Sequence, residues 1–206
     1  MSPAARILVV RHGETASNAA RIFQTPDTPL SELGREQAAR LGRRLRVHPV
    51  ARVLASDLTR AVETAEAVCA TTRAALSLDP LLQERNFGRL RGTAYADFAG
   101  DPFASDYTPP EGESWADFHA RVDAAWSAIA NAAAEGEGDL VVVTHGLVCR
   151  AIAQHKLALE GLSLEQVAFA NTSVTIVEAS VPWRALRLAC TEHLDELSRS
   201  TGGGRA

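Results

Sequence analysis

The sequence predicts an α/β fold with a largely parallel sheet, and two observations support this prediction. Short apolar runs alternate along the 206 residues with segments of helical periodicity, which is the rhythm of successive βαβ units. Two of these runs, "ILVV" from Ile7 and "LVVV" from Leu140, each lead within two residues to a histidine that is followed by glycine. Ligands of parallel sheets bind beyond the carboxyl ends of the strands. We therefore expect a binding site at that edge of the sheet.

The expected strands and helices alternate along the chain. The apolar runs predict strands at residues 6–10, 52–55, 76–78, 140–143, 173–178 and 185–189. Helical spacing of apolar residues predicts helices over residues 31–47, 58–70 and 114–135. In the last of these, Ser114 and Asp117 resemble a capping box, and Gly136 and Gly138 end the helix.

The length of the chain favours one catalytic domain, which we place over residues 1–197. Residues 87–112 contain three prolines and four glycines, and this stretch, called the wall segment below, is expected to form the wall or lid of a pocket. Residues 198–206, "SRSTGGGRA", have no apolar content to pack and predict a disordered tail.

Composition excludes several classes of partner. A net charge of −4 provides no basic field for nucleic acid, and no run approaches the roughly 20 apolar residues that span a membrane. The beginning of the chain is too short and polar for a secretory signal, and Cys69, Cys149 and Cys190 do not form a disulfide pattern. We expect a cytoplasmic protein with a small ligand; the sequence leaves the oligomeric state open, with a homodimer as one candidate.

The two His-Gly pairs are the first candidates for the site. A single histidine at a strand end is ordinarily a hydrogen-bonded structural residue, but two at equivalent ends, one beside an arginine, indicate a functional site. Arg11 and His12 would point to opposite faces of a strict strand, so both serve one ligand only if the chain turns at Gly13. His145 and Gly146 form the second pair.

The chemistry of this set favours phosphoryl transfer through a histidine. Zinc sites usually carry ligands at short spacing, which is absent, and Cys149 is followed at once by Arg150 without the loop that a cysteine phosphatase needs. Arg60 falls in the first turn of a helix that Ser56 or Asp57 is expected to cap, where a cation opposes the helix dipole. Anion binding explains an arginine there, and pairing with Asp57 or Glu63 is the alternative.

At this point the motifs resemble a known family. The motifs "RHGET" with Asn18, "DTPLSELGREQA", "SDLTRAVETA", "LLQERNFGRLRG", "PPEGES" and "VVVTHG" are similar to those of the histidine phosphatase superfamily, in its phosphoglycerate-mutase-like branch. The resemblance covers residues 6–171 and implies a three-layer α/β/α sandwich with a mostly parallel central sheet. It also implies catalysis without a metal or another cofactor.

The resemblance assigns roles residue by residue. It implies that His12 is the nucleophile that becomes phosphorylated and that Glu84 is the proton donor. Arg11, Arg60 and His145 complete the phosphate pocket, and Asn18, Gln24 and Gly146 are expected to contact the substrate. Physical reasoning adds two expectations: His12 is neutral, with its second nitrogen held by a carbonyl near Gly13, and His145 acts as a cation.

Departures from the family pattern concern the substrate subsite. Leu147 replaces a second glycine after His-Gly, and Gln24-Thr25 replaces a common Gln-Gly. Residues 93–110 contain no Lys or Arg, whereas mutases carry a basic insertion there. We therefore expect a phosphatase that acts on a small phosphorylated metabolite. The alternatives are a phosphoglycerate-mutase-type transferase and an inactive phospholigand-binding module. Arg21, Arg85, Arg89 and Arg91 are candidates for contacts with the distal part of the substrate.

Overall fold

The computed structural model describes residues 5–195 and contains one six-stranded sheet. Its strands are β1 (Arg6–Arg11), β2 (Val50–Ala55), β3 (Ala75–Leu78), β4 (Asp139–Thr144), β5 (Val174–Glu178) and β6 (Ala185–Cys190). The order is β3-β2-β4-β1-β5-β6, in which β3, β2, β4 and β1 are parallel and β5 is antiparallel to both of its neighbours. The predicted mostly parallel α/β sheet is confirmed, and every predicted strand overlaps an observed one.

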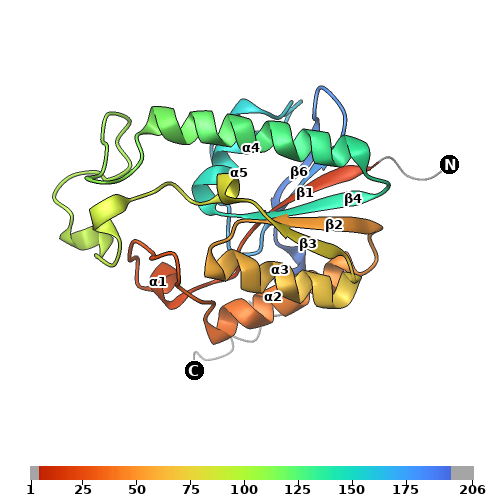
Figure 1. Ribbon diagram of the computed structural model, residues 1–206, viewed down its shortest axis with the longest axis horizontal. Helices are drawn as coiled ribbons and strands as arrows, with labels where there is room; N and C mark the ends of the chain where they lie inside the picture. The colour runs from red at the N-terminus through yellow and green to blue at the C-terminus, as the bar shows by residue number, and fades with distance from the viewer. Residues whose placement is uncertain (1–4, 196–206) are drawn as a thin grey trace.

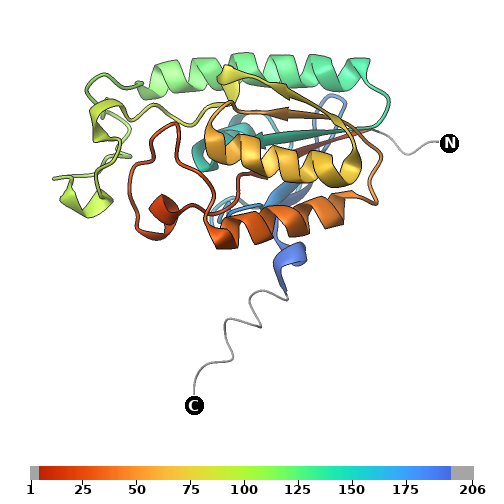
Figure 2. The ribbon, with the colours of Figure 1, turned by 60° about the horizontal axis from the view of Figure 1, so that its bottom comes forward.

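Helices cover both faces of the sheet, as the predicted three-layer sandwich requires. The α-helices are α1 (Ala16–Ala19), α2 (Glu32–Leu45), α3 (Thr59–Thr72), α4 (Trp115–Glu135) and α5 (Gly146–His155). Helices α4 and α5 lie on one face and α2 and α3 on the other (Figure 1). The turned view in Figure 2 separates the two helix layers with the strands between them.

Alternation along β1 explains how the sheet supports two cores. Ile7 and Val9 belong to the apolar cluster beneath α4 and α5, whereas Leu8 and Val10 belong to the cluster beneath α2 and α3. All four side chains are at most 1% exposed, because successive side chains of a strand point to opposite faces. A strand buried on both faces reads as a continuous apolar run, which is the pattern of "ILVV".

The helix starts follow the sequence with one exception. Ser31 and Ser114 cap α2 and α4 by accepting hydrogen bonds from the backbone N–H groups of Gly34 and Asp117. The predicted capping of α3 by Ser56 or Asp57 is wrong, since the cap residue is Leu58, whose side chain cannot accept a bond. The Ser56 and Asp57 side chains instead bond to His145 and to Gln83.

The wall segment lies beyond the carboxyl ends of the parallel strands, at the left of Figure 1. It contains only the short 3₁₀ turns η2 (Gly88–Leu90) and η3 (Tyr95–Asp97). No helix within residues 5–195 is long and apolar enough to cross a membrane, and the three cysteines are free. The predicted disordered tail lies outside the described residues, and the division into one domain stays a prediction.

Candidate active site

The pairing of β1 with β4 brings the two His-Gly pairs together. Arg11 is the register partner of Thr144, so the next residue of each strand, His12 and His145, leaves the sheet at the same level. The centroids of the two imidazole rings are 5.1 Å apart. Arg11 and His12 line the same pocket, and the strand ends at Arg11 without an assigned turn or bend at Gly13. An added Cβ at Gly13 would lie 2.6 Å from the carbonyl oxygen of Gly34, so close approach rather than an unusual φ requires glycine.

His12 is held in one orientation. Its Nδ1 lies 2.7 Å from the carbonyl oxygen of Gly13, which must accept a hydrogen bond, so Nδ1 carries the proton and Nε2 carries the lone pair. Burial holds the pKa of His12 well below its usual value, and the positive charges of Arg60 and Arg11 lower the pKa further. The expected carbonyl partner of His12 is confirmed, and the lowered pKa favours the expected neutral imidazole.

His145 differs from the expectation. Its Nε2 lies 2.9 Å from Ser56 Oγ, and its Nδ1 has no hydrogen-bond partner within residues 5–195. Burial first, and then Arg60 and His12, hold the pKa of His145 well below its usual value. The protein's own groups therefore favour a neutral imidazole, and the predicted cation requires the negative charge of a phosphate ligand to raise this pKa.

Two arginines face the histidines. Arg60, in the first turn of α3, is buried; its Nε donates to His12 Nε2 over 3.3 Å and its Nη1 donates to the carbonyl of Thr25. Burial lowers the pKa of Arg60 to about 10, so the guanidinium stays charged at neutral pH. Arg11 donates to the carbonyl of Phe169, and its buried Nε has no hydrogen-bond partner in the described chain.

The alternative for Arg60, an ion pair with an acidic neighbour, is not what the structure has. Glu63 accepts a hydrogen bond from the backbone N–H of Leu30, and Asp57 accepts one from Gln83. Unpaired N–H donors on buried cations around a neutral imidazole form an arrangement that suits a tetrahedral anion.

Glu84 is the acidic side chain on the wall of the same pocket. Burial raises its pKa above the usual value, and this effect outweighs the opposing hydrogen bond from the backbone N–H of Leu147 and the charge of Arg60. A carboxyl group with a raised pKa retains its proton to a higher pH, which is the state that a general acid needs.

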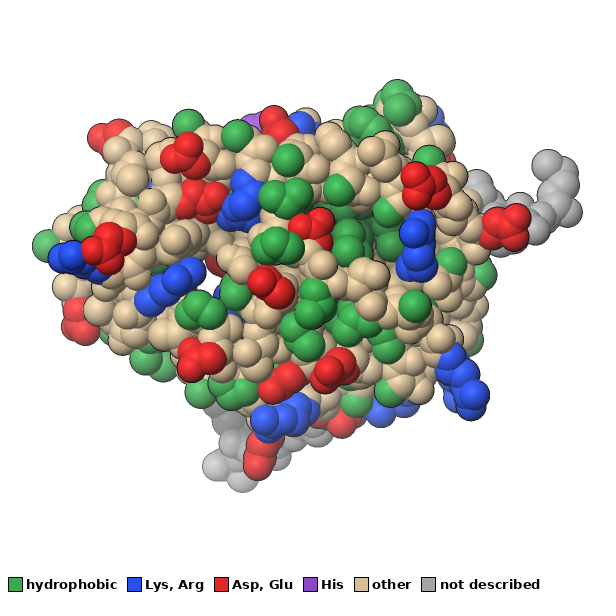
Figure 3. Space-filling model, in the orientation of Figure 1, with side chains coloured by type: hydrophobic (Ala, Val, Ile, Leu, Met, Phe, Trp, Pro, Cys, Tyr) green, Lys and Arg blue, Asp and Glu red, His purple; other side chains and the backbone are tan. Residues whose placement is uncertain are grey.

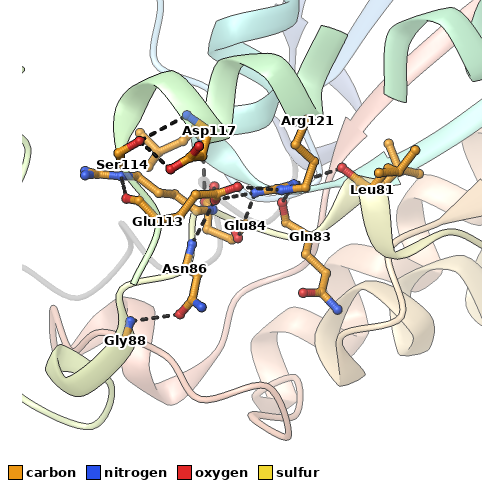
Figure 4. Close-up of polar contacts among 12 residues, drawn as sticks. Leu81, Gln83, Glu84, Asn86, Gly88, Glu113, Ser114, Asp117 and Arg121 are labelled. Atoms are coloured by element: carbon orange, nitrogen blue, oxygen red, sulfur yellow. Dashed lines mark hydrogen bonds and ion pairs between the residues drawn. The ribbon is translucent and has the colours of Figure 1, made fainter. Parts of the chain in front are cut away.

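Arg121 of α4 holds the backbone around Glu84 in place (Figure 4). Arg121 donates hydrogen bonds to the carbonyl oxygens of Leu81, Gln83 and Glu84. It also forms a two-pronged ion pair with Glu113, at 2.8 and 2.7 Å. Glu113 is thus the ion-pair partner of Arg121 and lies outside the pocket lining.

These residues line one cavity of about 280 Å³. Its lining includes seven of the eight residues that the sequence predicted for catalysis and substrate contact: Arg11, His12, Asn18, Gln24, Arg60, Glu84 and Gly146. The eighth, His145, is the N-cap residue of α5, is fully buried and is not part of the lining. Gln24 accepts a hydrogen bond from Thr15, and Asn18 accepts one from Asn171. Among residues 5–195, no three His, Cys, Asp or Glu side chains are grouped so that they could hold a metal ion.

Sequence reasoning missed the supporting residues. Ser56 bonds His145, and Thr64 accepts a hydrogen bond from the backbone N–H of Gly13. Arg121 was also missed, since an arginine within an amphipathic helix gives no sign of its partners. Cys149 is buried in α5 within the apolar cluster beneath α4 and α5, and burial raises the pKa of its thiol.

The fold is that of the histidine phosphatases, and the chain belongs to the histidine phosphatase superfamily (branch 1), whose sequence model matches residues 7–188. It is 33% identical to phosphoglycerate mutase-like protein 4 of Arabidopsis thaliana, over 98% of this chain and 93% of the relative. It is 32% identical to the broad-specificity phosphatase YOR283W of Saccharomyces cerevisiae, over 93% and 88%. The solved structure of Bacillus stearothermophilus YhfR superposes with a TM-score of 0.80 at 31% identity, covering 93% of this chain and all of that one.

Proposed function

We propose that this protein is a phosphatase that hydrolyses small phosphate monoesters through a phosphohistidine on His12. The main support for this proposal is the orientation of the His12 ring. Its Nδ1 donates a hydrogen bond to the Gly13 carbonyl, and its Nε2 faces the guanidinium of Arg60. A neutral imidazole whose lone pair lies on Nε2 is a nucleophile once a phosphate draws the Arg60 N–H away from that nitrogen, and the cations around it attract and orient the phosphate.

In the first step, His12 Nε2 attacks phosphorus and the bond to the leaving oxygen breaks. Glu84 gives its proton to that oxygen, while Arg11, Arg60 and His145 stabilise the oxygens of the transferred group. In the second step, Glu84 takes a proton from water, the resulting hydroxide oxygen bonds to phosphorus, and the bond to His12 breaks. Inorganic phosphate leaves, and Glu84 is protonated again.

A phosphoglycerate-mutase-type transfer is the second candidate. The stretch "ERNFGRLRG" and the identity to a phosphoglycerate mutase-like protein favour it. The phosphatase is preferred because residues 93–110, where mutases carry a basic insertion, contain no Lys or Arg.

The test is an assay of the purified protein with p-nitrophenyl phosphate, a panel of sugar phosphates, and 2- and 3-phosphoglycerate, in the presence of EDTA. The proposal expects release of inorganic phosphate, unchanged by the chelator and abolished in His12→Ala. Interconversion of the phosphoglycerates without phosphate release would instead support the mutase. Binding without turnover would support the inactive module, and an active His12→Ala variant would contradict the mechanism.

A further inference from the structure

Five arginines line the pocket, and they differ in what holds them. Four donate side-chain hydrogen bonds within the protein: Arg11 to Phe169, Arg60 to Thr25 and His12, Arg85 to three carbonyls, and Arg150 to Val167. The fifth, Arg91, has neither a side-chain hydrogen bond nor an ion pair with any residue that the structure describes. Its guanidinium therefore has donors unused by the protein.

Arg91 is half-buried among like charges. Its positive charge contributes to lowering the pKa of Arg60, so the two guanidinium groups are within electrostatic reach of each other. Burial alone lowers the pKa of Arg91, with no acidic group opposing it. Placing a cation beside other cations costs free energy unless an anion joins them.

The backbone holds Arg91 in place. The next residue, Gly92, donates its N–H to the carbonyl of Phe23 over 2.7 Å, and Phe23 donates to the carbonyl of Thr93 over 3.0 Å. The bridge between Ile22 and Ala94 continues this pairing. These bonds hold the backbone beside Arg91, whose side chain lines the pocket. Figure 3 shows a hollow on this face with Lys or Arg side chains beside it.

The other arginines of the wall segment and its surroundings do not share this arrangement. Arg85 is 1% exposed and packs on the Trp115 ring, so it supports the wall from within. Arg89 forms an ion pair with Glu111 and does not line the pocket. Arg21 is exposed, over the ring of Tyr95, and also lies outside the lining.

We propose that Arg91 binds a second anionic group of the substrate, so that the preferred substrate is a compact phosphate monoester that also carries a carboxylate or a second phosphate. This inference rests on the proposed function and adds the substrate class. One phosphate occupies the end of the pocket at His12, and the second anion reaches Arg91 at the rim.

The test compares two probes that differ only at the distal carbon: 3-phosphoglycerate, with a carboxylate, and glycerol 3-phosphate, with a hydroxymethyl group. The wild type should favour the first in kcat/KM, and Arg91→Gln should lower that value by about 10- to 100-fold, the range for a lost charge-assisted hydrogen bond. Glycerol 3-phosphate and p-nitrophenyl phosphate should change less than about twofold in the variant. Fructose 1,6-bisphosphate against fructose 6-phosphate tests whether a second phosphate is accepted instead.

Arg89→Gln is the matched control, because it removes an arginine two residues away that pairs with Glu111, and it should leave all values unchanged. Equal losses for both members of a pair in Arg91→Gln, no loss for either, or a wild type that prefers the neutral member of both pairs would overturn the inference. Calorimetric binding of the same probes separates this result from the proposed function. A protein that hydrolyses nothing but loses 3-phosphoglycerate affinity in Arg91→Gln would retain the subsite and contradict the phosphatase.

Discussion

The two ends of the pocket are built in different ways. The inner end, called the floor here, is formed where β1, β4 and α3 meet, and its residues Arg11, His12, Arg60 and His145 are fixed by strand register and by helix position. The outer end is formed by the wall segment, whose Phe87 and Tyr95 rings pack on the Phe23 ring, with centroids 4.7 and 4.4 Å from it.

This difference separates chemistry from selection. In the proposed mechanism the floor holds the transferred phosphoryl group, which is common to all monoesters, so changes there should affect every substrate alike. The wall would contact the remainder of the substrate, so changes there should affect some substrates and spare others. Glu84 belongs to both regions in this proposal, because it protonates the leaving oxygen.

The largest differential effect is expected from Glu84→Gln, which keeps the shape of the side chain and removes the acid. An alkoxide leaving group needs a proton and p-nitrophenolate does not, so phosphorylation of His12 by an alkyl phosphate should slow by about 10²–10⁴-fold and that by p-nitrophenyl phosphate far less. The basic limb of the pH profile should flatten for the alkyl substrate, because that limb reports loss of the Glu84 proton.

Single-turnover burst rates are required for this comparison, since dephosphorylation also uses Glu84 as a base. Equal losses in the burst for the two substrates would remove Glu84 from the role of acid.

Arg60→Ala probes the floor. It should lower kcat/KM by about 10²–10³-fold for alkyl and aryl phosphates alike, because it removes a preorganised cation at the phosphoryl oxygens. The sign of the pH effect is also fixed: Arg60 helps to lower the pKa of His12, so its removal raises that pKa and moves the acid limb of kcat/KM to higher pH. Arg43→Ala, an exposed arginine of α2, is the control. A loss confined to one substrate class would break the division between floor and wall.

Arg121→Gln should give a smaller effect, because Arg121 positions the Glu84 backbone without lining the pocket. We expect roughly a 10-fold loss for alkyl phosphates, since a displacement of about 1 Å can cost 10²-fold. The loss should be smaller for p-nitrophenyl phosphate, and Arg121→Lys should recover part of it. Thermal unfolding of each variant ensures that the assays use folded protein. Equal losses for both substrates would indicate a general structural role for Arg121.

Cys149→Ala should have the smallest effect on turnover. The thiol is buried in α5, so its removal leaves the floor intact and costs about 1 kcal/mol of folding free energy through lost packing. Steady-state rates with a chemical denaturation curve measure both quantities. Loss of activity in a folded variant would indicate that the Cys149 thiol takes part in catalysis.

The sequence predicted the floor better than the wall, for physical reasons. The floor residues follow apolar strands or begin a helix, and the rule that parallel strands present their carboxyl ends at one edge brings them together. The roles of Arg21, Arg85, Arg89 and Arg91 depend on loop contacts. Arg85 became a buried support, Arg89 an ion-pair partner and Arg91 a pocket residue, although all three lie within "ERNFGRLRG". No periodicity distinguishes them.

The sequence pattern also failed to predict the cap of α3 and the protonation state of His145. Ser56 resembled a helix cap, but its hydroxyl bonds His145. The charge of His145 depends on burial and on two arginines that are distant in sequence, so the expectation of a cation neglected the cost of placing one beside others.

The central claim is that His12 carries the phosphoryl group during turnover. The direct measurement is rapid quench of the protein with labelled substrate, followed by peptide mapping of the label. The account predicts an acid-labile, base-stable phosphohistidine at residue 12 that forms within one turnover and is absent from His12→Ala. Turnover without a trapped phosphoenzyme, or label on another residue, would contradict the account.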